Sequence, residues 1–220
     1  MCSRVTLRSE RDRILREFGI EQLTFDYKPR YNISPTENLL VLSEREGQPR
    51  LAMLRWGLVP SWAEDPSIGN KLINARAETL AEKPSFRDAY KKRRCLILVD
   101  GFFEWQQVDR RRLPSYIHQT DDRPMSFAGL WETWNKGDEP LATCTIVTTG
   151  PNELVAPLHN RMPAIIPPEE RDAWLDSDTP PEIIRSLLRP YEGGDLEAYR
   201  VSVKVNTPGY DAPDCIELAR

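Results

Sequence analysis

Runs of apolar and alternating positions along the chain predict strands separated by turns, with several short helices. Residues 95–99 form an uninterrupted apolar run, which is typical of a strand buried on both faces. Ile14, Leu15 and Phe18 recur at helical spacing before Gly19, and they predict a short amphipathic helix within residues 3–20. The other strands are expected at 39–42, 50–59, 113–119, 125–134, 141–148 and 199–205. The other helices are expected within 86–94, 167–175 and 181–188.

Length and composition restrict the class of protein. The chain has 220 residues, enough for one well-filled hydrophobic core, so we expect one domain. Hydrophobic residues make up 40% and charged residues 29%, a balance typical of a folded protein and not of a disordered one. The sequence has neither an apolar run of about 18 residues nor a basic-then-apolar leader. We therefore expect a cytoplasmic protein, associated with the nucleoid if its source is bacterial, and no membrane partner.

Charge and cysteine content exclude further classes. The net charge of −4 argues against indiscriminate binding of nucleic acid through a broad basic surface, although a local groove built from a few arginines is compatible with it. The four cysteines lie far apart without a CxxC pair, and only two histidines accompany them. Neither a zinc site nor a disulfide framework is expected.

The residue after the initiator methionine has the most unusual chemistry in the chain. Once Met1 is removed, Cys2 carries both a free α-amine and a thiol. The amine titrates near ~7.7–8.0 and the thiol near ~8.5, so each has a usable nucleophilic fraction at neutral pH. The pair can condense with an aldehyde and close a five-membered thiazolidine ring, or the thiolate can attack an acyl carbon with the amine as its base. The plain alternative is a cysteine without function at a frayed terminus.

Three other side chains are candidates for catalysis or binding. Glu104 stands between bulky aromatic residues, and this environment is expected to raise the pKa of its carboxyl toward the range useful for proton transfer. His159 lies between two prolines near Arg161, a cation that disfavours imidazolium and leaves a ring able to accept or relay a proton. Trp62 ends an aromatic loop, 56–62, that suits either stacking on a base or capping of the core. The alternative for Glu104 is a structural carboxylate that accepts hydrogen bonds from backbone amides. The alternative for His159 is an ordinary loop residue.

The remaining basic and polar segments are expected to be structural. Residues 91–94 are basic and complement the dipole at a helix C-terminus. Residues 110–112, three arginines in succession, are expected at the solvated tip of a hairpin, and His118 has no partner motif beside it. The arginines of residues 3–20 form the solvated face of their helix, with Arg4 as the exception because it lies two residues from Cys2.

Six blocks of sequence, taken together and in order, resemble one family. They are Cys2 directly after Met1, YNISPT at 31–36, WGLVPSW at 56–62, NARAET at 74–79, GFFEW at 101–105 and PLHNRMP at 157–163. This set is similar to the signature of the SOS response-associated peptidase family, the SRAP domain. The match extends from residue 2 to about residue 205. The resemblance implies a single α+β domain over 1–220, with a strand-rich core flanked by helices and a short C-terminal tail.

The resemblance also implies a function and a set of catalytic residues. The family captures abasic sites in single-stranded DNA during the DNA damage response, because the ring-opened sugar presents an aldehyde to the N-terminal cysteine. Cys2 would be the nucleophile, Asn74 would orient its amine or thiol, and Glu104 would be the general acid and base. His159 would help to open the sugar ring. A peptidase-type removal of Met1 and a lyase-like activity are further implications, and no metal or organic cofactor is needed.

A positively charged groove for single-stranded DNA is implied as well, on a protein that we expect to be a monomer. Arg4, Arg76 and Arg161 would hold flanking phosphates through bidentate contacts. Trp62 and Trp105 would stack or wedge at the lesion, where the missing base leaves a gap.

The sequence departs from the family at its start, and two other functions stay open. Ser3 stands where the family usually has glycine, which adopts backbone angles closed to serine, so either this turn is unstrained or Cys2 is aimed slightly differently toward an aldehyde. One alternative is a peptidase or amidase that uses Cys2 as an N-terminal nucleophile. The other is a non-catalytic binder of single-stranded DNA in which Cys2 is incidental.

Overall fold

Five strands close into a barrel in the computed structural model, which describes residues 2–45, 47–207 and 209–219. In order around the barrel, each strand pairs with the next as β10-β4-β3-β6-β9, and β9 pairs with β10 again. The pairing of β10 with β4 is parallel and the other four are antiparallel. The strands are β3 (Asn38–Arg45), β4 (Gln48–Trp56), β6 (Arg94–Val99), β9 (Met125–Trp134) and β10 (Leu141–Thr149).

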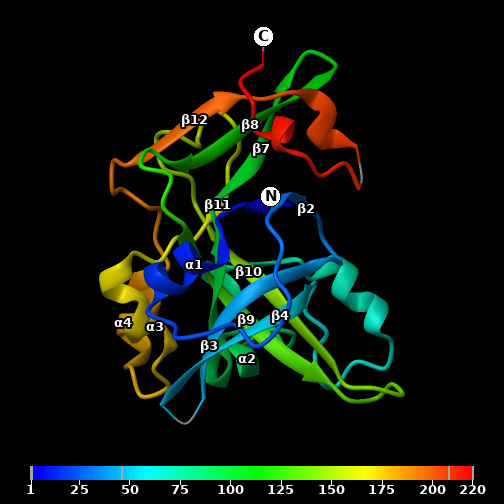
Figure 1. The fold of residues 1–220 in the computed structure, drawn as a ribbon. Helices are drawn as coiled ribbons and strands as arrows, with labels where there is room; N and C mark the ends of the chain where they lie inside the picture. The colour runs from blue at the N-terminus through cyan, green and yellow to red at the C-terminus, as the bar shows by residue number, and fades with distance from the viewer. Residues whose placement is uncertain (1, 46, 208, 220) are drawn as a thin grey trace.

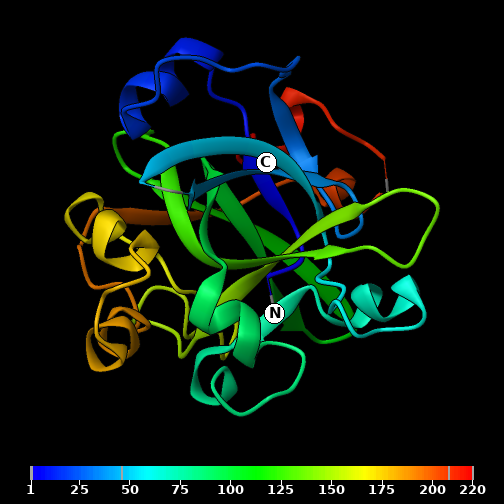
Figure 2. The ribbon, with the colours of Figure 1, turned by 90° about the horizontal axis from the view of Figure 1, so that it is seen from below.

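A second sheet lies beside the barrel, and the chain enters it first. Its order is β12-β8-β7-β1-β2, so the short strand β1 lies between β7 and β2. Figure 1 shows β7, β8 and β12 above the barrel, and in Figure 2 the blue strand β1 runs through the middle of the molecule. The strands are β1 (Val5–Leu7), β2 (Arg30–Ile33), β7 (Gly101–Val108), β8 (Arg111–Gln119) and β12 (Leu196–Arg200).

Short helices and two small strands complete the fold. β5 (Asn74–Arg76) pairs in parallel with β10, and β11 (Met162–Pro163) pairs antiparallel with its end. The described helices lie at the periphery (Figure 1), and none is long and apolar enough to cross a membrane. They are α1 (Arg11–Phe18), α2 (Arg87–Lys92), α3 (Arg171–Leu175) and α4 (Pro181–Leu187), with 3-10 turns η1 (Pro66–Lys71), η2 (Ala77–Thr79), η3 (Pro168–Glu170), η4 (Val203–Asn206) and η5 (Pro213–Cys215).

The observed fold is the strand-rich α+β class that the resemblance implied. Every residue of β6 is buried, as its continuous apolar run predicted, and β9 has the predicted bounds. The prediction of a strand through 199–205 was partly wrong, because β12 ends at Arg200 and residues 203–206 form a 3-10 turn. The sequence also gave no sign of β1, since three residues are too few for alternation to appear.

The C-terminal segment is packed against the second sheet. Val205 and Cys215 are fully buried, and they form a small core with Val201 and with Phe103 and Tyr116 of β7 and β8. This core is separate from the large one inside the barrel. Residues 203–216, which showed no periodicity in the sequence, therefore form part of the wall beside β7.

Candidate active site around Cys2

Cys2 lies immediately before β1 and is completely buried. The register of β1 with β7 places Val5 opposite Phe102, and the Phe103 backbone N–H donates to the Arg4 carbonyl at 3.0 Å. The Cys2 thiol lies 3.9 Å from the same carbonyl. The pairing of β1 therefore fixes Cys2 near the segment of β7 that carries the candidate acid. Met1 lies outside the described residues.

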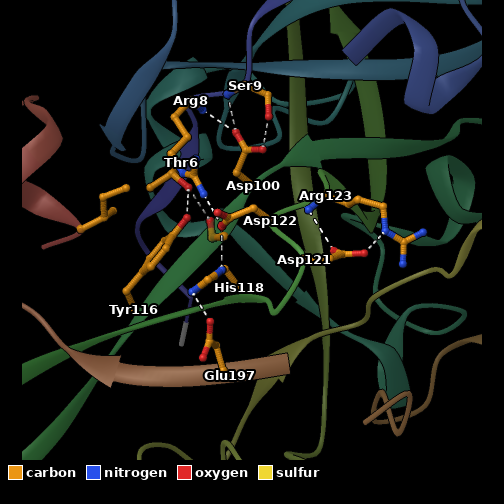
Figure 3. Close-up of polar contacts among 12 residues, drawn as sticks. Thr6, Arg8, Ser9, Asp100, Tyr116, His118, Asp121, Asp122, Arg123 and Glu197 are labelled. Carbon is orange, nitrogen blue, oxygen red and sulfur yellow. Dashed lines mark hydrogen bonds and ion pairs between the residues drawn. The ribbon is translucent and has the colours of Figure 1, made fainter. Parts of the chain in front are cut away.

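A buried polar network anchors β1 from its other end (Figure 3). The Asp100 carboxylate accepts hydrogen bonds from the backbone N–H groups of Arg8 at 2.5 Å and Ser9 at 2.7 Å, and from the Ser9 hydroxyl at 2.5 Å. The hydroxyls of Thr6 and Tyr116 lie 2.8 Å apart, a hydrogen bond between β1 and β8. These contacts fix the position of β1 relative to β7 and β8.

Asn74 joins the other side of the site. It is the first residue of β5, where it lies opposite Ile146 of β10. Its side-chain amide donates to the Cys2 carbonyl at 2.7 Å, so this bond connects the barrel side of the molecule with the start of β1. The oxygen of the Asn74 side-chain amide, Oδ1, is buried and has no hydrogen-bond partner among the described residues.

Glu104 on β7 is also buried, with 1% of its surface exposed. Loss of solvation raises the pKa of its carboxyl to about 7, in agreement with the prediction from its aromatic neighbours. Burial also raises the pKa of the Cys2 thiol well above its ordinary value, and the negative charge of Glu104 adds to that rise. At neutral pH the thiol therefore keeps its proton, whereas the Glu104 carboxyl titrates close to that pH.

His159 lies in the loop between β10 and β11. Burial lowers the pKa of its imidazole, and the positive charges of Arg112 and Arg161 lower it further. The Arg161 backbone N–H donates to its Nδ1 at 3.0 Å, so the neutral ring carries its proton on Nε2. The loop is tied to β7 because the Gln106 side chain donates to the Pro157 carbonyl at 3.4 Å.

The three predicted phosphate-binding arginines differ in their surroundings. Arg161 forms a two-pronged ion pair with Glu78, at 2.7 and 3.0 Å, and donates to the Thr148 carbonyl at 2.5 Å. Arg4 donates through one guanidinium nitrogen to the Asn32 side chain and the Val205 carbonyl, both at 3.0 Å. The exposed Arg76 has no hydrogen-bond or ion-pair partner in the described part of the chain.

Trp56 and Trp62 of the aromatic loop and Trp105 of β7 differ in burial and in hydrogen bonding. Trp56 is fully buried and its indole N–H donates to the Ile73 carbonyl at 2.8 Å, so it caps the core. Trp62 is 50% exposed, and its indole N–H donates to the Pro84 carbonyl at 3.4 Å. Trp105 on β7 is half-buried, and its indole N–H donates to the Asn206 side chain at 2.6 Å.

Ser3 does not strain the backbone. The non-glycine residues with positive φ in the described ranges are Thr36, Asp109 and Asp122. Position 3 therefore has backbone angles open to any residue, and the replacement of glycine by serine needs no distortion of the turn that carries Cys2.

Two residues near Cys2 escaped the sequence analysis. Arg112 and Asn206 line a hollow of about 330 Å³ together with Ser3, Arg4 and Trp105. Arg112 was expected at a solvated hairpin tip, but the guanidinium lies over the Trp105 ring, 5.7 Å from its centroid. Only the register of β7 with β8 reveals this proximity. Within the described ranges no group of three or more His, Cys, Asp or Glu side chains could hold a metal ion.

Comparison with known proteins identifies the family. The family model for SOS response associated peptidase (SRAP) matches residues 1–208. The chain is 46% identical to the abasic site processing protein YoqW of Bacillus subtilis, over 99% of both chains, and 31% identical to the abasic site processing protein YedK of Escherichia coli, over 80% of this chain and 79% of that one. A crystal structure of a protein from Bacteroides thetaiotaomicron covers the whole of both chains with a TM-score of 0.90 at 27% identity. The protein therefore belongs to the SRAP family.

Proposed function

We propose that this protein processes abasic sites, and that it captures them in single-stranded DNA as a thiazolidine formed by Cys2 after removal of Met1. The observation that carries the proposal is the placement of Cys2 between Asn74, which donates to its carbonyl, and Glu104, whose pKa is raised to about 7. The relatives YoqW and YedK are abasic site processing proteins, and this supports the choice of substrate.

The proposed reaction has two steps and releases one water molecule. The Cys2 amine attacks the aldehyde carbon of the ring-opened sugar, and the resulting carbinolamine loses water to give an imine. The thiol sulfur then adds to the imine carbon while its proton passes to the nitrogen, which closes the ring. The imine is also the species from which the 3′ phosphate can be eliminated, so a lyase-like side reaction competes when ring closure is slow.

Glu104 is suited to move the protons of both steps. With a pKa of about 7 the carboxyl is populated in both forms near neutral pH, so it can accept a proton from the amine or thiol and return one to the departing water. The side-chain amide oxygen of Asn74, Oδ1, has no partner among the described residues. It can accept a hydrogen bond from the amine that Cys2 gains when Met1 is removed. His159, with its proton on Nε2, is suited to donate to the sugar ring oxygen.

The raised pKa of the Cys2 thiol favours this reaction over acyl transfer. An N-terminal nucleophile peptidase or amidase begins with attack by the thiolate, a form that burial disfavours here. Imine formation begins with the amine instead, and the thiol reacts only afterwards, within the same molecule. The site therefore supports aldehyde capture better than peptide hydrolysis.

A denaturing gel tests the proposal. Met-trimmed protein is mixed with a single-stranded oligonucleotide that carries one abasic site, and with an intact control. We expect a shifted band only with the lesion, and its loss in Cys2→Ala, which leaves salt-sensitive binding in place. Capture that survives Cys2→Ala would assign the covalent bond to a different residue. Binding without any shifted band by protein whose Met1 is removed would replace this proposal with the peptidase or amidase, or with the non-catalytic binder.

A further inference from the structure

A hollow lies beside Cys2 on the side of Trp105. Its lining comes from segments distant in sequence: Ser3 and Arg4 before β1, Trp105 on β7, Arg112 on β8 and Asn206 in the C-terminal segment. Its volume is about 330 Å³. Ser3, the direct sequence neighbour of Cys2, lines the hollow, so the hollow begins one residue away from the candidate nucleophile.

The strand register directs Arg112 into this hollow. Trp105 lies opposite Pro114 across the β7–β8 pair, and Arg112, two residues before Pro114, shares that face as the diagonal neighbour of Trp105. Its guanidinium carbon lies 5.7 Å from the centroid of the Trp105 ring. Within residues 2–45, 47–207 and 209–219 no carboxylate pairs with Arg112, so the guanidinium donors are available to a ligand.

The opposite wall is held in place by the C-terminal segment. The Asn206 side chain accepts the Trp105 indole N–H at 2.6 Å, and the neighbouring Val205 carbonyl accepts from Arg4 at 3.0 Å. Burial of Val205 and Cys215 against β7 and β8 fixes this segment. The ring of Trp105 and the guanidinium of Arg4 are therefore oriented before any ligand arrives.

We propose that this hollow is a subsite for the nucleotide next to the abasic one, and that Arg112 binds its phosphate. The subsite rests on the proposed function. A phosphodiester has the charge and the acceptor oxygens that an unpaired guanidinium binds, and the Trp105 ring offers a flat face to the attached sugar or base. Arg112 also lies close enough to Glu104 and His159 to lower the pKa of each, which agrees with a place beside the reacting groups.

The test compares two arginines of the same hairpin. Arg110→Gln removes the same charge from the turn but from a residue that does not line the hollow. Both Arg112→Gln and Arg110→Gln are made in the Cys2→Ala background, and the affinity for an abasic single-stranded oligonucleotide is measured across salt concentrations. Arg112→Gln is expected to lower the slope of log affinity against log salt by about 0.7 and the affinity about fivefold at about 0.1 M salt. Arg110→Gln should leave both values close to the parent.

A charge-conserving variant separates the subsite from a general loss of structure. Arg112→Lys keeps one phosphate contact, so it should retain the salt slope of the parent. Equal slopes and affinities for Arg112→Gln and Arg110→Gln would overturn the subsite, even if the protein with an intact Cys2 still forms the crosslink. Failure of that crosslink in the gel assay, with the Arg112 effect present, would instead overturn the covalent step and leave a phosphate subsite on a binder.

Discussion

Asp100, directly before β7, and Glu104, within β7, lie four residues apart and are both 1% exposed, yet their surroundings differ. The Asp100 carboxylate accepts three hydrogen bonds from Arg8 and Ser9. Glu104 is held in a poorly solvated place that raises its pKa to about 7. Burial of a carboxylate therefore does not by itself indicate catalysis. Asp100 serves as a structural anchor through these three hydrogen bonds, whereas loss of solvation raises the pKa of Glu104.

The difference also separates the tasks of the two ends of β1. At the far end Asp100 fixes the strand through residues 8 and 9 (Figure 3). At the near end the same strand presents Cys2 to Glu104 and Asn74. Substitutions at each position test whether the two tasks are separate.

The largest expected effect is on the rate of capture in Glu104→Gln. The amide keeps the size of the side chain but cannot exchange a proton, so the rate should fall about 10²- to 10⁴-fold. Single-turnover crosslinking to an abasic oligonucleotide near neutral pH measures it. Asp100→Asn is the matched control, and the folded fraction of that variant should react at nearly the rate of the parent. Equal losses in the two variants would remove the distinction between them.

The anchor should dominate stability instead. Asp100→Ala leaves the backbone N–H groups of Arg8 and Ser9 without their acceptor, so the free energy of unfolding should fall by about 3 kcal/mol. Urea unfolding measures this change. Asp178→Ala, which removes an exposed carboxylate, should alter stability by less than about 0.5 kcal/mol. A loss at Asp100 no larger than that at Asp178 would contradict the anchoring role.

Stability should respond to pH through Glu104 in a defined direction. Its pKa rises from an ordinary 4.5 to about 7 in the folded protein, so the folded state binds the proton more tightly. The stability that this group contributes is present below about pH 4.5 and is lost as pH rises through about 7. Relative to the parent, Glu104→Gln should therefore gain about 1–3 kcal/mol between about pH 5 and about pH 8. A difference that does not change with pH would show that the carboxyl is not perturbed.

The smallest expected effect belongs to Asn74. Its bond to the Cys2 carbonyl orients the nucleophile without taking part in proton transfer, so Asn74→Ala should cost about 1 kcal/mol in the barrier, roughly fivefold in rate. Single-turnover rates of the two variants give the comparison with Glu104→Gln. A loss as large as that of Glu104→Gln would give Asn74 a direct part in the chemistry.

The sequence predicted the long strands, but it carried little information on the geometry around Cys2. The strands at 95–99 and 125–134 have clear apolar patterns and were confirmed. Asp100 directly precedes the block 101–105 that contains Glu104, and the hydrogen bonds that make it an anchor come from donors more than 90 residues away. Arg112 looked like a solvated arginine because only the β7–β8 register places it over Trp105.

The C-terminal segment gave no periodic signal for a related reason. Residues 203–216 fold into two 3-10 turns, which are too short to show a hydrophobic repeat. Their two fully buried residues, Val205 and Cys215, are ten positions apart and become informative only against β7 and β8.

Mass spectrometry of the crosslinked N-terminal peptide tests the central claim most directly. Met-trimmed protein is incubated with the abasic oligonucleotide without any reducing agent, and the nuclease- and protease-digested product is fragmented. We expect the peptide that begins with Cys2 to carry the sugar remnant, with the mass of one water lost. The remnant is joined through both the nitrogen and the sulfur of Cys2, so the thiol no longer reacts with an alkylating agent. A remnant attached to a different residue, or a Cys2 thiol that is still open to alkylation in the crosslinked species, would contradict it.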